Sequence, residues 1–473
     1  MVLGRIAGFF GARDALPAVV GDGTDLGGGI ESICITSNED EGKQVSIQDG
    51  TAAVLYYESI LQDSIRATVT FTDTGGTVDD KTAMEGLPIV GQENVQVQLR
   101  DNNDVELKVT MYINAITPLV QDAQKSIVQL DLASKEFIMN EKVRINKRFN
   151  GKVSDHVKKI LEDQIYLGTE KEYDIEETQH EQNYIGNNKK PFYIINWLCR
   201  GAVSKDSSLG NSAGYFFWET AEKFHFKSID SLMDTTTNEP KRSFLYNESP
   251  DEDNLDAEYD GKALDYSVKN RVNIQKKLQM GAYSTRTIMF DPYNCKYEVA
   301  YPNAGNTKGA PSTSKGNEEN LKLSGKNLPV LNKEFNKEQP GKEFTRTTYY
   351  VLDNGTLPSG TGEGEEQEQI EKSKDENYKP GVVLNQGIMR MNQLFALQTT
   401  ITIPADFTLH AGDAIFVDSP EVNVDAEGGL EKNQQTGGNY IIADLCHYMS
   451  AKHTLTKLNL IRDSFGRKPK GSG

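Results

Sequence analysis

Alternating apolar and polar positions dominate the first part of the chain. In the segments 65–71, 95–99 and 107–113 an apolar side chain recurs at every second residue. This period is typical of strands that bury one face. The run Asp-Asn-Asn-Asp at 101–104 predicts a hairpin turn between the last two segments. We therefore expect half-buried antiparallel strands, arranged as a barrel or a sandwich.

A second β unit is predicted to start after Pro118, because positions 128–132 again alternate apolar and polar residues. Helical spacing follows, and it predicts an amphipathic helix of about three to four turns that carries Val153, Val157, Ile160, Leu161 and Ile165. Pro191 suits the first turn of another helix, and the aromatic residues of 215–226 return to strand spacing.

Residues 401–463 predict a compact antiparallel meander. Ile401 and Ile403 precede a turn at Pro404, where proline fixes φ and removes a backbone donor. A second turn at 411–413 precedes the short apolar strand 414–417, and Leu458 and Leu460 alternate with polar residues. Such a meander at the end of a long chain is typical of a closed β-barrel.

The order and spacing of these features resemble the closing strands of the baseplate hub proteins of contractile-tailed bacteriophages. That family includes the late-control tail-hub protein of temperate phages and the first half of the type VI secretion spike protein. The residues that carry the resemblance are Pro404, Gly412, Asp413, Gly438, Tyr440, His447, Arg462 and Asp463. The segments 152–167, 191–204, 215–226 and 228–232 match in order, as do Met280, Gly281, Tyr283 and Asp291. The similarity spans most of residues 30–465, and 303–380 depart from it.

The resemblance implies a mainly β protein with a few helices (α+β) and two tail-tube-like antiparallel β-barrels interleaved in sequence, plus insertion loops. The first barrel is expected to take residues 29–119 plus about 206–265. The second, with helices, is expected to take 120–205 plus about 266–302 and 381–465. An N-terminal arm (1–28), a low-complexity insertion (303–380) and a tail (466–473) complete the division. The insertion is too polar and acidic to bury a core.

The function that the resemblance implies is a structural baseplate hub. Three chains would form a pseudo-hexameric ring that joins a trimeric central spike to a hexameric tail tube and leaves a channel for genome ejection. The expected partners are the chain itself as a homotrimer, the central spike protein, the tail tube or tube-initiator protein and the surrounding baseplate proteins. DNA would pass through the lumen without specific binding, and no membrane insertion is expected. The expected location is the virion baseplate, assembled in the host cytoplasm.

Three alternatives stay open. The same hub could serve a type VI-like secretion or extracellular injection machine, although those spikes usually fuse the hub to a needle, and here little follows the last strand. A β-rich carbohydrate-binding or hydrolytic tail protein would need a cleft with paired carboxylates on firm strands. A tube or sheath component would normally carry one barrel and form sixfold rings.

Composition narrows these choices. The chain has 473 residues, which predicts two or three domains. The formal charge is 51 − 69 = −18, which argues against a surface for DNA or membranes. It fits either simple solubility or an acidic lumen that repels phosphate. Four widely spaced cysteines lack metal-site spacing, so buried free thiols are expected, as in a reducing cytoplasm: Cys34, Cys199, Cys295 and Cys446. No apolar run approaches the roughly 20 residues of a membrane span.

Candidate chemistry is sparse. The chain has no GxSxG, HExxH or phosphate-loop motif, and the glycines at 21–23 and at 305 and 309 lack the preceding strand. His447 and His453 with Asp444 could form a catalytic or metal cluster, but strand spacing turns His447 away from Asp444. The acidic stretch 251–260 lacks the glycine and the final glutamate of a calcium loop; it holds Asp251, Asp253, Asp256, Glu258 and Asp260. Tyr215, Phe216, Phe217 and Trp218 suit a core better than a sugar platform. We predict no catalytic, cofactor-binding or metal residues, no cofactor, and no enzyme.

Overall fold

The computed structural model describes residues 28–467 except 40–41, 75, 77–80, 88, 123–124, 207–212, 235, 247–254, 256, 271–272, 283–284, 292–294, 301–325, 328–345, 352–379 and 422–431. The predicted N-terminal arm, most of the 303–380 insertion and most of the 466–473 tail therefore lie outside the described residues. So do Tyr283, the glycines at 21–23, 305 and 309, and three members of the acidic stretch, Asp251, Asp253 and Asp256.

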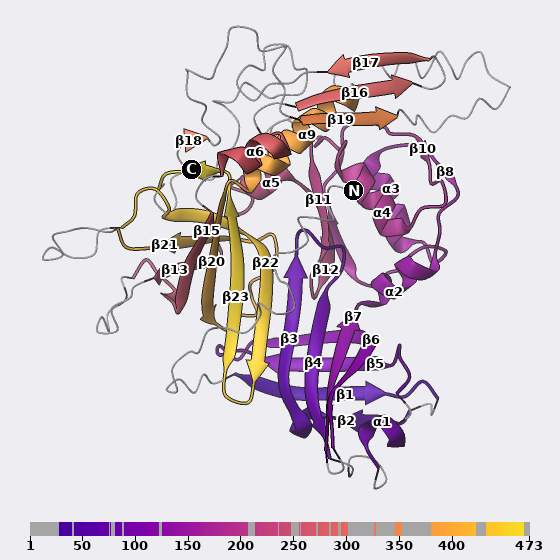
Figure 1. The fold of residues 1–473 in the computed structure, drawn as a ribbon, viewed down its shortest axis with the longest axis vertical. Coiled ribbons are helices and arrows are strands. Elements are labelled where there is room, and N and C mark those ends of the chain that lie inside the picture. The colour runs from indigo at the N-terminus through magenta and orange to yellow at the C-terminus, as the bar shows by residue number, and fades with distance from the viewer. Residues whose placement is uncertain are drawn as a thin grey trace, which may run out of the picture.

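The first curled sheet comes from one continuous part of the chain, and all its pairings are antiparallel (Figure 1). Its strands are β1 (Gly29–Thr36), β2 (Gln44–Ser46), β3 (Thr51–Ser59), β4 (Arg66–Asp73), β5 (Asn94–Arg100), β6 (Glu106–Gln121) and β7 (Ser126–Ala133). They lie in the order β3-β4-β7-β6-β5-β1-β2. A short helix, α1 (Ala83–Gly86), and a 3-10 turn, η2 (Gln48–Gly50), lie between strands.

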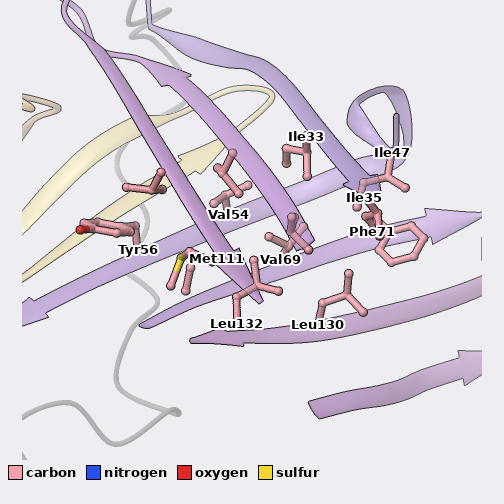
Figure 2. Packing of buried hydrophobic residues seen from close by; sticks show 14 of the residues in the cluster. Ile33, Ile35, Ile47, Val54, Tyr56, Val69, Phe71, Met111, Leu130 and Leu132 are labelled. Carbon is pink, nitrogen blue, oxygen red and sulfur yellow. The ribbon is translucent and has the colours of Figure 1, made fainter. Parts of the chain in front are cut away.

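The alternating apolar side chains predicted for this region form one core. Figure 2 shows Val54 from β3, Val69 and Phe71 from β4, and Met111 from β6 pointing into the same space. Each is at most 1% exposed, as the period-2 pattern requires. The predicted 101–104 turn is confirmed, because Arg100 pairs with Glu106 across it.

Strand β7 was expected to open a second β unit after Pro118, but it lies between β4 and β6 of the first sheet. Its apolar residues Val128, Leu130 and Leu132 join the first core. The physical reason is its register: Val128 pairs with Phe71 on β4 and with Pro118 on β6. A single strand pattern carries no information about such partners.

The second curled sheet contains β13 (Ser243–Tyr246), β14 (Gly261–Ala263), β15 (Asp265–Asn270), β20 (Leu397–Pro404), β21 (Ala414–Asp418), β22 (Gly438–Ser450) and β23 (Thr454–Arg462). Strand β22 joins the two sheets, since its start pairs with β21 and its end pairs with β3. Most pairings are antiparallel, as expected, but β13 runs parallel to both β14 and β21. The strands predicted for residues 401–463 are present, since β20 ends at Pro404 and β21 stops before Pro420. The meander is only partly confirmed: β21, β22 and β23 are neighbours in chain order, but β20 pairs with β15 and β23 and not with β21.

A helical module packs beside the sheets (Figure 1). It comprises α2 (Lys135–Lys142), β8 (Arg148–Phe149), α3 (Val153–Glu162), β9 (Glu172–Ile175), β10 (Tyr184–Ile185), α4 (Pro191–Cys199), β11 (Tyr215–Glu219) and β12 (Lys223–Ser228). The predicted helix at 153 is present, but it ends at Glu162, and Ile165 is 74% exposed. The chain turns at Asp163, whose extended backbone ends the helix before Ile165 can join the buried face.

The remaining elements lie at the top of Figure 1 or near the C-terminus. They are α5 (Ile229–Met233), α6 (Ile274–Met280), β16 (Thr285–Asp291), β17 (Lys296–Ala300), β18 (Lys326–Asn327), β19 (Arg346–Val351), α9 (Pro380–Leu394) and β24 (Ser464–Phe465). The predicted fold class, mainly β with a few helices, is confirmed. The division into two barrels stays a prediction.

Candidate functional site: a buried junction between the sheets

Glu58 is the centre of a polar junction where three parts of the chain meet. It continues the inward face of β3 after Val54 and Tyr56, and its side chain is fully buried. Its carboxylate accepts hydrogen bonds from the Tyr56 hydroxyl at 2.9 Å and from the Ala221 and Ala411 backbone N–H groups at 2.9 and 3.1 Å. The junction thus ties β3 of the first sheet to the β11–β12 turn and to the turn before β21.

An ion pair supports these bonds. His410 Nδ1 lies 3.2 Å from a Glu58 carboxylate oxygen. Burial alone would raise the pKa of Glu58, but His410 and the two N–H groups lower it to about 2. Burial likewise opposes the charge on His410, and Glu58 outweighs it and raises the pKa of His410. A buried carboxylate is tolerated here because every described contact stabilises its ionised form.

Trp218 and Gly412 fix the distance between the β11–β12 hairpin and the second sheet. The indole N–H donates to the Ala411 carbonyl at 2.9 Å, and the ring stacks on His225 at 4.8 Å between centroids. Gly412 has φ +92°, and a Cβ there would lie 2.6 Å from Trp218 Cζ2. Only glycine fits this turn without moving the ring. The Gly-Asp turn of the resemblance is therefore a contact point between two modules.

Glu219, next to Trp218 on β11, is a second buried carboxylate of the junction. One carboxylate oxygen accepts the Ile65 N–H at 3.0 Å, and the other accepts Lys171 Nζ at 2.7 Å. Burial raises the pKa of Glu219 to about 7 even though Lys171 opposes the shift. When Glu219 ionises above about pH 7, the folded protein therefore holds a buried negative charge that lowers its stability.

Replacing Glu219 by glutamine (Glu219→Gln) is expected to remove a pH dependence. The folded pKa of about 7 exceeds the ordinary value of 4.5, so the folded state binds more protons and loses stability as pH rises between these values. The change corresponds to about 3 kcal/mol. Urea unfolding at pH 5 and pH 8 should show a smaller fall in unfolding free energy for Glu219→Gln than for the parent chain.

The matched control for that prediction is Glu177→Gln, since Glu177 is exposed and pairs with Lys205 at the surface. It should leave the pH dependence above pH 5 unchanged. An equal slope for the parent chain and Glu219→Gln would contradict the assigned role.

A second buried cluster, here called the Arg462 clasp, closes the end of the second sheet. Arg462 is 0% exposed, and its guanidinium donates to the carbonyls of Ser464, Gly437 and Gln435 at 2.7, 2.9 and 2.7 Å. It also lies 4.7 Å from the centre of the Tyr440 ring. The clasp thus unites Arg462 and Tyr440 of the resemblance with the backbone beside Gly438.

The histidine cluster considered from sequence does not assemble. His447 is buried, bonds Thr456 Oγ1 at 2.7 Å and packs between Tyr56 and Phe407. Burial lowers its pKa to about 4. Asp444 instead bonds Ser59 and Asn459. Within the described residues, no group of three or more His, Cys, Asp or Glu side chains could hold a metal ion.

The other candidates have ordinary structural surroundings. Asp260 accepts hydrogen bonds from the Ser243 N–H and hydroxyl, and Glu258 pairs with Lys432. All four aromatic residues of 215–218 are buried, and they alternate between two core clusters on opposite faces of β11. No helix in the described part of the chain is long and apolar enough to cross a membrane.

The four cysteines are free thiols, as expected, but only Cys199 and Cys446 are buried. Cys34 is half-buried, and Cys295 is exposed because it lies in the turn between β16 and β17 with φ +50°.

Sequence reasoning missed the Glu58 junction. A signal was present: Glu58 occupies the third inward position of a strand whose other inward residues are apolar, and an acid there needs internal partners. No comparable signal marks His410.

No protein-family model matches the chain. Among curated proteins it is 22% identical over 319 residues to the probable baseplate hub protein gp334 of Vibrio phage KVP40. The match covers 66% of each chain, just under two thirds of that protein's length. The chain is similar to a phage baseplate hub protein. The predicted resemblance to baseplate hub proteins is thereby confirmed.

Matches among solved structures include two tail proteins. One is the 43 kDa tail protein of prophage MuSo2 from Shewanella oneidensis, 11% identical, with a TM-score of 0.48, covering 92% of this chain and 98% of that one. The other is the tail protein from Neisseria meningitidis MC58, 10% identical, with a TM-score of 0.48, covering 92% and 97%. Scores below 0.5 do not establish a common fold, so the function proposed below rests on the curated relative.

Proposed function

We propose that the chain is the structural hub of a contractile phage tail baseplate and has no enzymatic activity. Three copies form a pseudo-hexameric ring, in which the two curled sheets of each chain act as tube-like barrels. The ring joins the central spike protein to the tail tube or its initiator, and surrounding baseplate proteins bind its outside. Similarity to the KVP40 hub protein is the observation that carries this proposal.

The open edge of β6 supports assembly into a ring. Residues 106–112 of this long strand pair with β5, but residues 115–121 have only β7 beside them among the described strands. Leu119 and Val120 are 50% and 48% exposed there. An unpaired edge with apolar side chains favours association with another chain.

The direct test is the mass of the purified chain by light scattering, with class averages from electron microscopy. A ring of three copies with a central pore and a six-lobed outline is the expected result. A compact monomer without a pore at high concentration would overturn ring formation by the chain alone. The overall charge of −18 further supports a lumen that repels DNA, and a basic lumen in such a reconstruction would contradict that part.

Charging the β6 edge is expected to weaken the ring. The double variant Leu119→Lys, Val120→Lys places two ammonium groups on the open edge, a device that blocks strand pairing between chains. We expect at least a tenfold rise in the dissociation constant of the trimer, measured by light scattering over a dilution series, with an unchanged thermal midpoint for the monomer.

The control for the edge variant is Val90→Lys, which alters a residue that is 74% exposed outside this edge. It should dissociate like the parent chain. If the double variant also does so, β6 is not an interface strand.

A further inference from the structure

One face of a small sheet is apolar and exposed. Strands β17, β16 and β19 pair so that Tyr297, Phe290 and Val351 form one row across the sheet. The next row on the same face is Val299, Ile288 and Tyr349. Tyr349, Tyr297, Val351 and Phe290 are 76%, 75%, 61% and 45% exposed. We call these six residues the aromatic face.

The opposite face of this sheet is already occupied. Thr285 and Thr287 of β16 both donate to Asn385 Oδ1 on α9, and Met289 is 4% exposed. Helix α9 packs against β16 and β17 of this sheet (Figure 1). The sheet is therefore held against the body of the protein, and its outer face presents aromatic side chains at fixed spacing. Exposed apolar surface of this kind usually marks a binding site.

The chain itself carries an apolar segment of matching chemistry. Residues 1–20 include Leu3, Ile6, Phe9, Phe10 and Leu16. The acidic segment 353–379, which follows β19 directly, is a poor match because it is dominated by glutamate and polar residues. We propose that the aromatic face binds residues 1–20 of a second copy of the chain.

The length of the arm allows exchange between copies, and symmetry favours exchange over the pairing of two aromatic faces. Gly28, from which the arm departs, is held by the Asn102 side chain beside β1 at 3.0 Å, and Figure 1 places β1 at the opposite end of the molecule from β16. Residues 1–27 extend to roughly 90 Å at most. Direct pairing of two aromatic faces would need a twofold axis, which a trimer lacks, whereas passing each arm to the next copy satisfies every copy of a closed ring. This step rests on the proposed trimer.

Photo-crosslinking of the full chain tests the proposal. Copies carrying p-benzoylphenylalanine in place of Phe10 are mixed with ¹⁵N-labelled copies of the parent chain, allowed to exchange, irradiated and digested. The expected products join a light peptide around residue 10 to a heavy peptide from 285–300 or 346–351. Crosslinks confined to light peptides after full exchange, crosslinks to other surfaces, or none at all would overturn the proposal.

Variants of the aromatic face separate this proposal from ring formation itself. Tyr297→Ser with Tyr349→Ser, and deletion of residues 2–20, should each raise the trimer dissociation constant at least tenfold, and combining them should add little. Tyr193→Ser, at a 56% exposed position on α4, is the matched control and should have no effect. A trimer unaffected by either change refutes arm exchange but leaves the hub function standing. A parent chain that stays monomeric refutes both.

Discussion

Replacing Arg462 by methionine (Arg462→Met) is expected to lower the free energy of unfolding by about 3–5 kcal/mol. Methionine fills a similar volume but cannot donate to the buried carbonyls of Gly437 and Ser464, which Arg462 now serves. It also loses the cation contact with the Tyr440 ring. Urea unfolding followed by tryptophan fluorescence, at a protein concentration where both chains have the same oligomeric state, measures the difference.

Arg148→Met is the control, because Arg148 is exposed and bonds only the nearby Asn150 side chain in the described contacts. Its effect should stay within about 0.5 kcal/mol. A loss of similar size in both variants would mean that the clasp contributes no more than a surface arginine. The alternative substitution Arg462→Lys should recover little, since one ammonium group cannot reproduce the guanidinium fork.

The local elements were largely predictable from the chain. Burial of one face gives a strand a period of two, and the patterns in β4, β5 and β6 predicted buried residues such as Val69, Val97 and Val109 correctly. Turn chemistry located the 101–104 hairpin and the end of β20 at Pro404. These signals depend on neighbours in sequence, so a single chain suffices to detect them.

Pairing between distant segments was not predictable in the same way. Glu58 and His410 are 352 residues apart, and nothing in either local sequence names the other. Strand β7 has a clear strand pattern, yet its position between β4 and β6 depends on partners that the pattern does not specify. Ile165 continued the helical spacing, but a backbone turn at Asp163 left it in solvent.

Two residues that carry the family resemblance, Gly412 and Arg462, make contacts with segments distant in sequence that no local pattern specifies. Gly412 allows the Trp218 ring to approach the second sheet, and Arg462 holds the chain at the end of β23. The first requirement is set by a contact between the β11–β12 hairpin and the second sheet, and the second by contacts within the second sheet. This explains why short motifs far apart in sequence indicated the fold better than any single strand pattern.

Replacing Glu58 by glutamine (Glu58→Gln) is expected to destabilise the protein by about 3 kcal/mol near pH 6. The folded pKa of Glu58, about 2, lies below the ordinary value of 4.5. The ionised group therefore stabilises the folded state above pH 4.5, and this contribution is lost as pH falls toward 2. The amide also brings its own N–H donors toward Ala221 and Ala411, whose backbone groups already donate to this site.

This prediction contains its own internal test. The difference between parent and Glu58→Gln in urea unfolding should shrink from pH 6 to pH 3, because the unfolded parent chain binds a proton at Glu58 below pH 4.5 while the folded chain still holds the carboxylate. Glu106→Gln, an exposed position paired with Lys108, should change stability by less than about 0.5 kcal/mol. A pH-independent loss would mean that Glu58 acts through its shape rather than its charge. Since Glu58 contacts the β11–β12 turn and the turn before β21 at once, a charge-dependent loss would show that electrostatics holds these two turns against β3, in addition to the pairing of β22 with β3.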